Sequence, residues 1–302
     1  VHISAGVSAW VAAWMLGPRR SDERASEQPH HIPMTMLGGA LLWFGWFGFN
    51  AGSALEAGAV ATNALVTTHL AASTALLSWM VLDLVIKGRT SGVGVAIGAV
   101  VGLVTITPAA GVVTPLGAMA MGLLGACCSY AAMLLLERFS VDDSLDVFAC
   151  HGVAGVVGAL LTGVFATVSV NPAGADGVLY GSWELMWPQL EGVLAAIVLA
   201  AVGTAIILKV LEATMGIRVS ENVELSLDQA EHHERAYVSH DGKLLGQLLI
   251  ENGVMGQSDL DACLKEQREA STPVRLGEIV LKRNLVDSAL LDRLVEQQRK
   301  AA

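Results

Sequence analysis

Long stretches without charge constrain this chain more than any other feature of its sequence. The longest, from Thr90 to Leu136, and the next, from Val147 to Ala175, contain no Asp, Glu, Lys or Arg. Apolar residues make up 53% of the chain and charged residues 15%, with a mean hydropathy of +0.56. Soluble domains rarely show this balance. The sequence therefore predicts an all-α, polytopic membrane helix bundle.

Seven apolar segments follow one another along the chain. Most approach the length of about 20 residues that a helix needs to cross the hydrocarbon core. They lie at about residues 1–17, 33–55, 61–86, 92–108, 114–136, 147–169 and 187–211. The stretch from Thr90 to Leu136 is too long for one span, and the Pro- and Gly-containing segment Thr107–Pro115 predicts a break into two helices joined by a short turn.

The basic residues between these segments predict how the chain is oriented. The connections after spans one, three and five carry all of them: Arg19, Arg20, Arg24, Lys87, Arg89 and Arg138. The connections after spans two, four and six carry no Lys or Arg. Because basic loops stay in the cytoplasm, this pattern predicts a cytoplasmic (inner) membrane protein whose C-terminus is cytoplasmic. The chain begins with Val inside an apolar run, so we expect its natural N-terminus to lie further upstream.

The sequence divides into a transmembrane domain (1–212), a regulatory tail (213–238) and a small helical module (239–302).

Net charge and cysteine content exclude some classes of protein. The net charge of −10 argues against a nucleic-acid partner. The four cysteines do not suggest a disulfide framework. The sequence predicts no enzyme activity, no cofactor and no metal site.

Glycine recurs at helical spacing inside the spans. The series are Gly94, Gly98 and Gly102; Gly117, Gly122 and Gly125; and Gly152, Gly155 and Gly158. Small residues on one helix face allow close approach where no hydrophobic effect drives helices together. We therefore expect these glycines to form packing contacts between spans.

Two histidines stand out within the apolar segments. His2 begins H-I-S-A-G and His151 begins H-G-V-A-G, so both read His-x-x-x-Gly in spans of opposite direction. An inverted repeat whose two functional helices meet near the midplane would leave this pattern. A titratable residue in a span is a candidate functional residue. The alternative is that each is an interfacial or core histidine hydrogen bonded to a backbone carbonyl.

Span two ends in an aromatic sequence, G-W-F-G-F-N-A-G-S, from Gly45 to Ser53. Aromatic side chains here have an ordinary explanation as an interfacial belt. Aromatic faces beside a hydroxyl can also hold a small cation as it loses water. The periodicity leaves both interpretations open.

Four motifs together resemble the ammonium transporter (Amt/Rh) family. They are H-I-P-M…G-W-F-G-F-N-A-G-S (31–53), T-P-A-A-G (107–111), V-D-D-S-L-D-V-F-A-C-H-G-V-A-G (141–155) and G-I-R-V-S…H-H-E-R-A-Y (216–237). The resemblance covers residues 1–238 and implies helices 5–11 of an eleven-helix fold built from two inverted halves and a final helix. It also implies a homotrimer with one hydrophobic pore per subunit.

The resemblance assigns roles to individual residues. His2 and His151 correspond to a twin-histidine pair that shares a hydrogen bond in the pore. Ser53 corresponds to the hydroxyl of an outer recruitment site, Phe49 to one ring of a phenylalanine gate, and Trp46 to a pore-lining tryptophan. Asp146 corresponds to an acidic residue at the start of the tenth helix, and a plain helix cap is its alternative role. The family's first four helices have no counterpart here.

The implied function is transport of ammonium or ammonia. Burying an ammonium ion in an apolar pore is costly, whereas ammonia is neutral, so deprotonation at the outer site followed by separate passage of ammonia and a proton lowers the barrier. A neutral histidine pair can accept from and donate to such solutes. The alternative function is an ammonium sensor that signals through the C-terminal module.

The region after span seven contains an internal repeat. Residues 244–267 and 275–298 align at an offset of 31 and predict two small helical units. The repeat resembles the cyclic di-GMP-binding N-terminal domain of type II secretion and pilus ATPases, whose units begin Arg-Leu-Gly. Arg275, Gly246 and Gly277 match that pattern, whereas Leu244 replaces the first arginine and Asn284 replaces a glycine. The alternatives are nucleotide binding and a plain interaction module. For residues 213–238, the resemblance to ammonium transporters implies a tail that can meet a PII-type regulator, and the alternative is a solvated run of charges.

Overall fold

A computed structural model describes residues 1–19, 31–136, 138–139, 141–224, 227–233, 245–269 and 274–301. These residues form helices and connecting turns, with one isolated bridge between Val113 and Ala166 and no strand. The predicted all-α class is therefore confirmed. Arg20, Arg24, Leu244 and residues 234–238 of the predicted tail lie outside the described residues. The chain divides into two units, Val1–Arg218 and Val219–Ala302.

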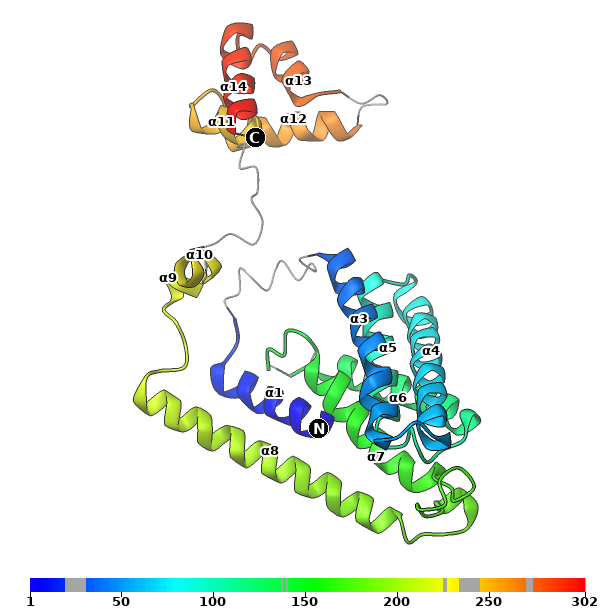
Figure 1. The fold of residues 1–302 in the computed structure, drawn as a ribbon. Helices are drawn as coiled ribbons and strands as arrows, with labels where there is room; N and C mark the ends of the chain where they lie inside the picture. The colour runs from blue at the N-terminus through cyan, green and yellow to red at the C-terminus, as the bar shows by residue number, and fades with distance from the viewer. Residues whose placement is uncertain are drawn as a thin grey trace. The chain divides into compact units, whose positions relative to one another are not determined.

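Seven helical segments of the first unit follow the predicted apolar stretches (Figure 1). They are α1 (His2–Leu16), α3 (Ile32–Ala51) with the 3₁₀ turn η1 (Gly52–Ala54), α4 (Ala59–Lys87), α5 (Gly92–Ile106), α6 (Pro115–Leu136), the π-helical turn η2 (Phe148–Val153) with α7 (Ala154–Phe165), and α8 (Met186–Thr214). Five are long and apolar enough to cross a membrane, whereas α1 and α5 have 15 residues each.

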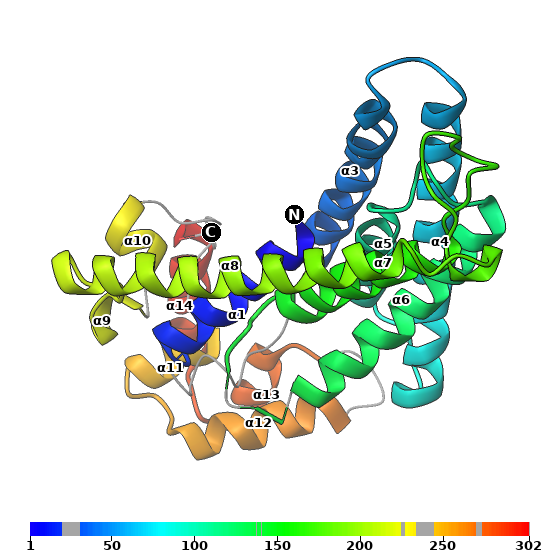
Figure 2. The ribbon, with the colours of Figure 1, turned by 90° about the horizontal axis from the view of Figure 1, so that it is seen from below.

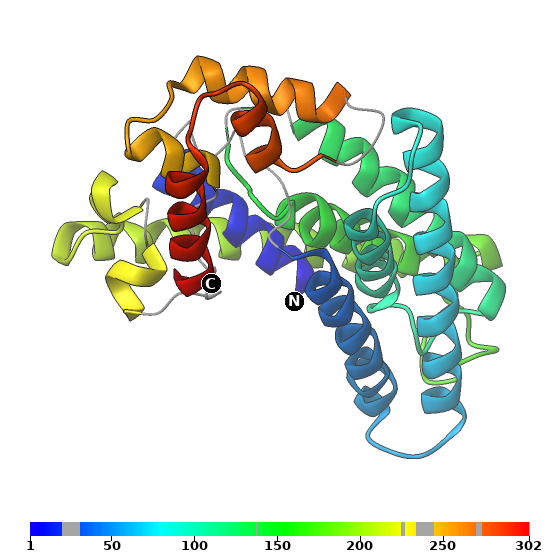
Figure 3. The same cartoon turned by 90° about the horizontal axis from the view of Figure 1, so that it is seen from above.

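Helices distant in sequence lie side by side in this unit. A broad loop joins α3 to α4 (Figures 2 and 3), and the two helices are in contact with each other. The long helix α8 packs against α1 and α7 (Figure 1). Together, these contacts bring the N-terminal end of α1 beside η2 and α3.

The predicted break between α5 and α6 is present, and α4 satisfies its backbone. α5 ends at Ile106 and α6 begins at Pro115. Asn63 Nδ2 donates to the carbonyl oxygens of Ala110 and Val113, both at 3.0 Å, and the Thr67 hydroxyl donates to Ala110 at 2.7 Å. Ala110 and Val113 are buried, so these carbonyl groups need such partners within the protein.

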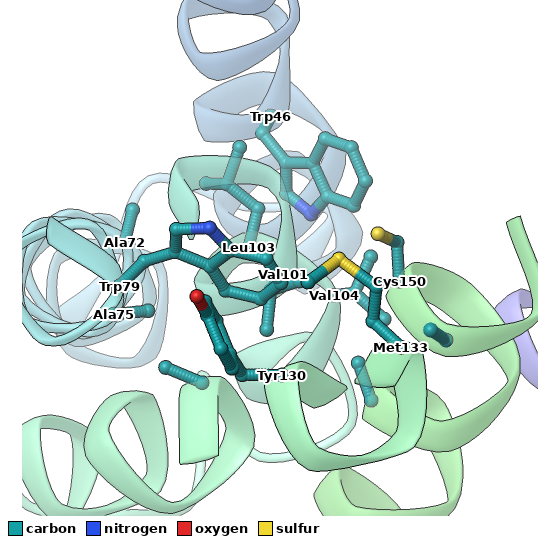
Figure 4. Packing of buried hydrophobic residues seen from close by; sticks show 13 residues of the cluster. Trp46, Ala72, Ala75, Trp79, Val101, Leu103, Val104, Tyr130, Met133 and Cys150 are labelled. Carbon is teal, nitrogen blue, oxygen red and sulfur yellow. The ribbon is translucent and has the colours of Figure 1, made fainter. Parts of the chain in front are cut away.

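The glycine series pack helix against helix, as the sequence predicts. A Cβ atom at Gly122 would meet backbone atoms of Ala71, and one at Gly158 would meet backbone atoms of Thr105. The core around these contacts contains Trp79 and Tyr130, whose rings meet edge to face with centroids 4.8 Å apart (Figure 4). Backbone-to-backbone packing therefore holds α4, α5, α6 and α7 together.

The second unit has a duplicated helical core. It contains α9 (Glu221–Glu224), α10 (Leu227–His232), α11 (Leu245–Glu251), α12 (Gln257–Glu269), α13 (Leu276–Lys282) and α14 (Ser288–Ala301). Two residues after the end of α11 and of α13 lies a left-handed residue, Gly253 (φ 67°) and Asn284 (φ 54°) respectively. The residue after each donates its N–H five positions back, Val254 to Leu249 and Leu285 to Val280. The paired residues are 31 positions apart, as in the predicted repeat. Asn284 can replace the glycine because asparagine tolerates the left-handed conformation.

Candidate functional site

Four of the five predicted pore side chains form one ring cluster. His2, the first residue of α1, stacks on Trp46 of α3 with centroids 5.1 Å apart and an interplanar angle of 18°. Phe49 lies one helical turn after Trp46, 6.1 Å from the His2 ring and 5.6 Å from the Trp46 ring. The His151 ring in η2 lies 5.7 Å from that of His2. We call His2, Trp46, Phe49 and His151 the ring cluster.

The two His-x-x-x-Gly motifs pack against each other. A Cβ at Gly6 would run into the backbone of Gly152, and one at Gly155 would lie 3.2 Å from the Cβ of His2. The glycine four residues after each histidine therefore lets the opposite helix approach. This close crossing is what brings two imidazoles within reach of the same space.

No hydrogen bond joins His2 and His151 in the part of the chain that the structure describes. Their atoms His2 Nε2 and His151 Nδ1 are both buried and have no hydrogen-bond partner there. The structure therefore does not contain the shared hydrogen bond that the family resemblance implies. Buried ring nitrogens without partners are unusual and leave donor or acceptor capacity toward a small polar solute.

Thr107 fixes the indole that stacks on His2. Trp46 Nε1 donates to Thr107 Oγ1 at 2.9 Å, and that hydroxyl donates to the Leu103 carbonyl at 2.8 Å. Thr107 is the residue after the last turn of α5, so the end of one helix orients a side chain of another. In the sequence Thr107 is recognisable only as part of a turn motif, which does not predict this role. Its position before Pro108 marks a helix end, but nothing in the sequence pairs it with Trp46.

An aspartate that the sequence analysis also missed caps the turn carrying His151. Asp143 Oδ2 accepts a hydrogen bond from the Phe148 N–H at 2.7 Å, at the first residue of η2. Asp146, the predicted acidic residue, lies between them in a left-handed conformation with φ 52°, and its carbonyl accepts from the Cys150 N–H at 2.9 Å. The carbonyl of Asp146 thus accepts from a residue of the π-helical turn, while the side chain of Asp143 caps its first residue.

Ser53 lies on a cavity of about 420 Å³ between the end of α3, the start of α4 and the α5–α6 turn. We call it the Ser53 cavity. The residues lining it are Phe49, Asn50, Ser53, Ala54, Glu56, Val60, Ala64, Thr107, Ala110, Gly111 and Asn171. The Ser53 hydroxyl donates its proton to the Phe49 carbonyl at 2.6 Å. Phe49, a member of the ring cluster, lines this cavity, and so does Thr107, which is hydrogen bonded to Trp46. The Ser53 cavity and the ring cluster are therefore adjacent.

The predicted nucleotide-site residues lie in the second unit. Arg275 is exposed and immediately precedes α13. A Cβ at Gly246 would lie 2.7 Å from Leu260 Cδ1, and one at Gly277 would lie 3.4 Å from Leu291 Cδ2. Gly246 therefore makes room for a leucine of the following helix, whereas at Gly277 a Cβ would make only ordinary contacts. Within the described residues, no group of three His, Cys, Asp or Glu side chains could hold a metal ion.

Comparison with known proteins finds a family that matches most of this chain. The model of the Ammonium Transporter Family matches residues 1–237. This chain belongs to the ammonium transporter family. An ammonium transporter from Aquifex aeolicus is 48% identical over 238 residues, covering 78% of this chain and 55% of that protein. The chain spans a little over half the length of the curated relatives it matches.

Solved structures of ammonium transporter family members share the fold. The crystal structure of Mep2 from Saccharomyces cerevisiae matches with a TM-score of 0.68 and 35% identity, covering 73% of this chain and 53% of that one. A structure described as a sensor Amt protein matches with a TM-score of 0.67 and 29% identity, covering 76% of this chain and 58% of that one.

Proposed function

We propose that this chain forms part of an ammonium transporter that moves ammonium or ammonia across the cytoplasmic membrane. The ring cluster is the observation that carries the proposal. It combines two imidazoles with buried nitrogens lacking partners, an indole whose plane is fixed by Thr107, and a phenyl ring next to the Ser53 cavity. Ammonium is the proposed substrate because the chain belongs to the ammonium transporter family.

The arrangement suits a solute that changes its charge on the way. Aromatic faces at Phe49 and Trp46 can hold a cation at the mouth of the pore. Beyond them the surroundings are apolar, so an ion that enters loses its favourable hydration. Giving up its proton avoids most of this cost, because ammonia is neutral. The imidazoles of His2 and His151 then offer hydrogen-bonding atoms to neutral ammonia, acting as the twin-histidine site of the pore.

Uptake of ¹⁴C-methylammonium by cells expressing the natural full-length protein tests this function. We expect saturable uptake, and a loss of at least about tenfold in the His151→Ala variant because the solute loses its polar partner. The matched control is His232→Ala, an exposed histidine of α10 in the second unit, which should leave uptake unchanged. Absence of uptake by the unmodified protein would rule out the transporter proposal.

Topology and assembly are part of the same proposal. We place seven spans in the inner membrane with the C-terminal unit in the cytoplasm, which the basic connections support. We propose a homotrimer with one pore per subunit, in line with the family. Cysteine accessibility at positions 56 and 233, on opposite predicted sides, would test the orientation, and native mass spectrometry would test the trimer.

The second candidate is an ammonium sensor. Similarity to a sensor Amt protein and the presence of a second folded unit after residue 218 favour it. A sensor would bind ammonium at the same ring cluster and change the state of the C-terminal unit. Uptake that is normal after deletion of residues 239–302 would support a transporter, whereas ligand binding without any uptake would support a sensor.

The C-terminal unit is proposed to respond to a soluble regulator. Its duplicated α11–α12 and α13–α14 core and Arg275 support cyclic di-GMP as a ligand, because an arginine can contact phosphate with charge-assisted hydrogen bonds. A PII-type protein is the proposed partner of the tail before it. Calorimetry with cyclic di-GMP on the full chain in detergent tests nucleotide binding, with Arg275→Ala as the control. No heat of binding to the unmodified chain would contradict the cyclic di-GMP proposal.

A further inference from the structure

The Ser53 cavity presents hydrogen-bond acceptors more than donors. The Ser53 hydroxyl has its only proton engaged by the Phe49 carbonyl, so it offers the cavity lone pairs. The Thr107 hydroxyl also donates to Leu103, and because it already accepts from Trp46 Nε1 it has one lone pair left. Asn171 is mixed, because its Oδ1 already accepts from Ala173 and its amide N–H groups remain. A guest that fits such a lining should be a donor.

Glu56 adds a negative charge to this lining. It is the one ionisable side chain among the described residues that line the Ser53 cavity, and it is exposed. No salt bridge or hydrogen bond involves its carboxylate in the described part of the chain. The connections at residues 52–58, 107–114 and 166–185 contain no Lys or Arg that could neutralise it. The charge therefore remains available to a mobile cation.

The backbone before Glu56 is held in an uncommon conformation. The 3₁₀ turn Gly52–Ala54 ends at Leu55, which is left-handed with φ 58° and has a side chain 93% exposed to solvent. A bulky residue in this conformation costs free energy, and such residues cluster at functional sites. Glu56 follows directly and lines the cavity, so the strained turn is part of what delivers the carboxylate there.

From these observations we infer that the Glu56 carboxylate is a further specificity residue of the Ser53 cavity, which draws the ammonium cation into it by its charge. An ammonium ion has four N–H donors and no lone pair, ammonia has three and one, and water has two and two. Only the cation both matches an acceptor-rich lining and is attracted by the carboxylate. The inference rests on the proposed transport function and adds a specificity residue to it.

The inference predicts how concentration and salt affect uptake. Attraction by one carboxylate raises the local concentration of a cation at the mouth and leaves the later steps in the apolar pore unchanged. Removing the charge should therefore raise KM without lowering the maximal rate. The effect should shrink at high ionic strength, because the Debye length falls from about 30 Å at 0.01 M to about 3 Å at 1 M salt.

The experiment measures ¹⁴C-methylammonium uptake by the natural full-length protein and its variants at low and high ionic strength. At low salt we expect Glu56→Gln to raise KM about three- to tenfold with the maximal rate unchanged. Glu56→Asp should have a smaller effect and Glu56→Lys a larger one. The control is Glu184→Gln, an exposed carboxylate on a connection of the same predicted side that does not line the cavity.

The outcomes separate the two levels of the proposal. Uptake by the unmodified protein with an unchanged KM in Glu56→Gln and Glu56→Lys would overturn the role of Glu56 and leave the transporter intact. An equal rise of KM in Glu184→Gln would also overturn it, because the effect would then belong to the whole surface. No uptake by the unmodified protein would instead overturn the proposed function. A rise confined to Glu56 that salt removes supports the inference.

Discussion

The two units of this chain handle close helix contacts and charges in opposite ways. In the first unit, glycines such as Gly122 and Gly158 face the backbone of a neighbouring helix. In the second, Gly246 faces the end of a leucine side chain. The first unit buries the carboxylate of Asp83 at 1% exposure, whereas the second keeps the Glu266–Arg283 pair at its surface. Packing in the first unit therefore depends on small residues that let helix backbones approach, whereas packing in the second depends on buried leucines.

The largest effect is expected at Asp83, where the contrast in charge placement is strongest. Its carboxylate accepts from Tyr130 Oη at 2.9 Å and pairs with Lys87 Nζ at 3.2 Å. Asp83→Ala leaves both partners without their acceptor and should lower the free energy of unfolding by about 3 kcal/mol. Thermal unfolding in detergent measures it. Asp83→Asn should lose roughly half as much, and equal stability of the two variants would contradict the role of the charge.

Gly158→Ala tests whether backbone contact is the rule in the first unit. The added methyl would meet the backbone of Thr105, which cannot rotate away, so we expect a loss of about 2–3 kcal/mol in the same thermal assay. The matched control is Gly203→Ala in α8, which has open space around it and should gain about 0.5–1 kcal/mol from helix propensity. An unchanged free energy of unfolding in Gly158→Ala would contradict the proposed difference in packing between the two units.

Gly246→Ala makes the corresponding change in the second unit. The methyl would meet Leu260 Cδ1, the movable end of a side chain, so the cost should be about 1 kcal/mol or less. Hydrogen exchange of the α11–α14 amides in the full chain reports it. Gly277→Ala, where the nearest atom is 3.4 Å away, serves as the control and should be neutral. A loss as large as that of Gly158→Ala would show that both units pack alike.

The smallest effect is expected from the surface charges of the second unit. The hydrogen bond from Arg283 holds the pKa of the Glu266 carboxyl below its usual value of 4.5. A lowered pKa stabilises the folded state above the unfolded pKa, and that contribution is lost as the pH falls through the folded pKa. Amide protection of α12 and α13 should therefore be flat near pH 7 and decrease below about pH 4.5. Glu266→Gln should flatten this decrease, and 1 M salt should weaken it.

The sequence predicts the helices and the members of the ring cluster better than the contacts between them. Apolar length and the Thr107–Pro115 break determine α5 and α6, and the His-x-x-x-Gly motifs indicate where two helices cross. The bond between Trp46 and Thr107 joins residues 61 positions apart, and no local signal marks it. The Asp143 cap was missed because three acidic residues precede η2 and only geometry selects one.

The repeat in the second unit can be predicted from the sequence because both copies form the same local helix and turn structure. The offset of 31 appears in the sequence as matching leucines and glycines, and in the structure as matching hydrogen bonds after Gly253 and Asn284. The functional meaning of Gly246 and Gly277 was harder to predict, because a glycine that admits a ligand and one that admits a leucine look alike in sequence.

Thr107 has a consequence for how related sequences can vary. Its hydroxyl belongs to the end of α5, yet it sets the plane of an indole on α3 that stacks on His2. A relative that replaces Trp46 by a residue without an N–H no longer needs an acceptor at position 107, and one that loses the acceptor strands a buried donor. The two positions are therefore expected to covary, because each removes or creates the need for the other's hydrogen-bonding group.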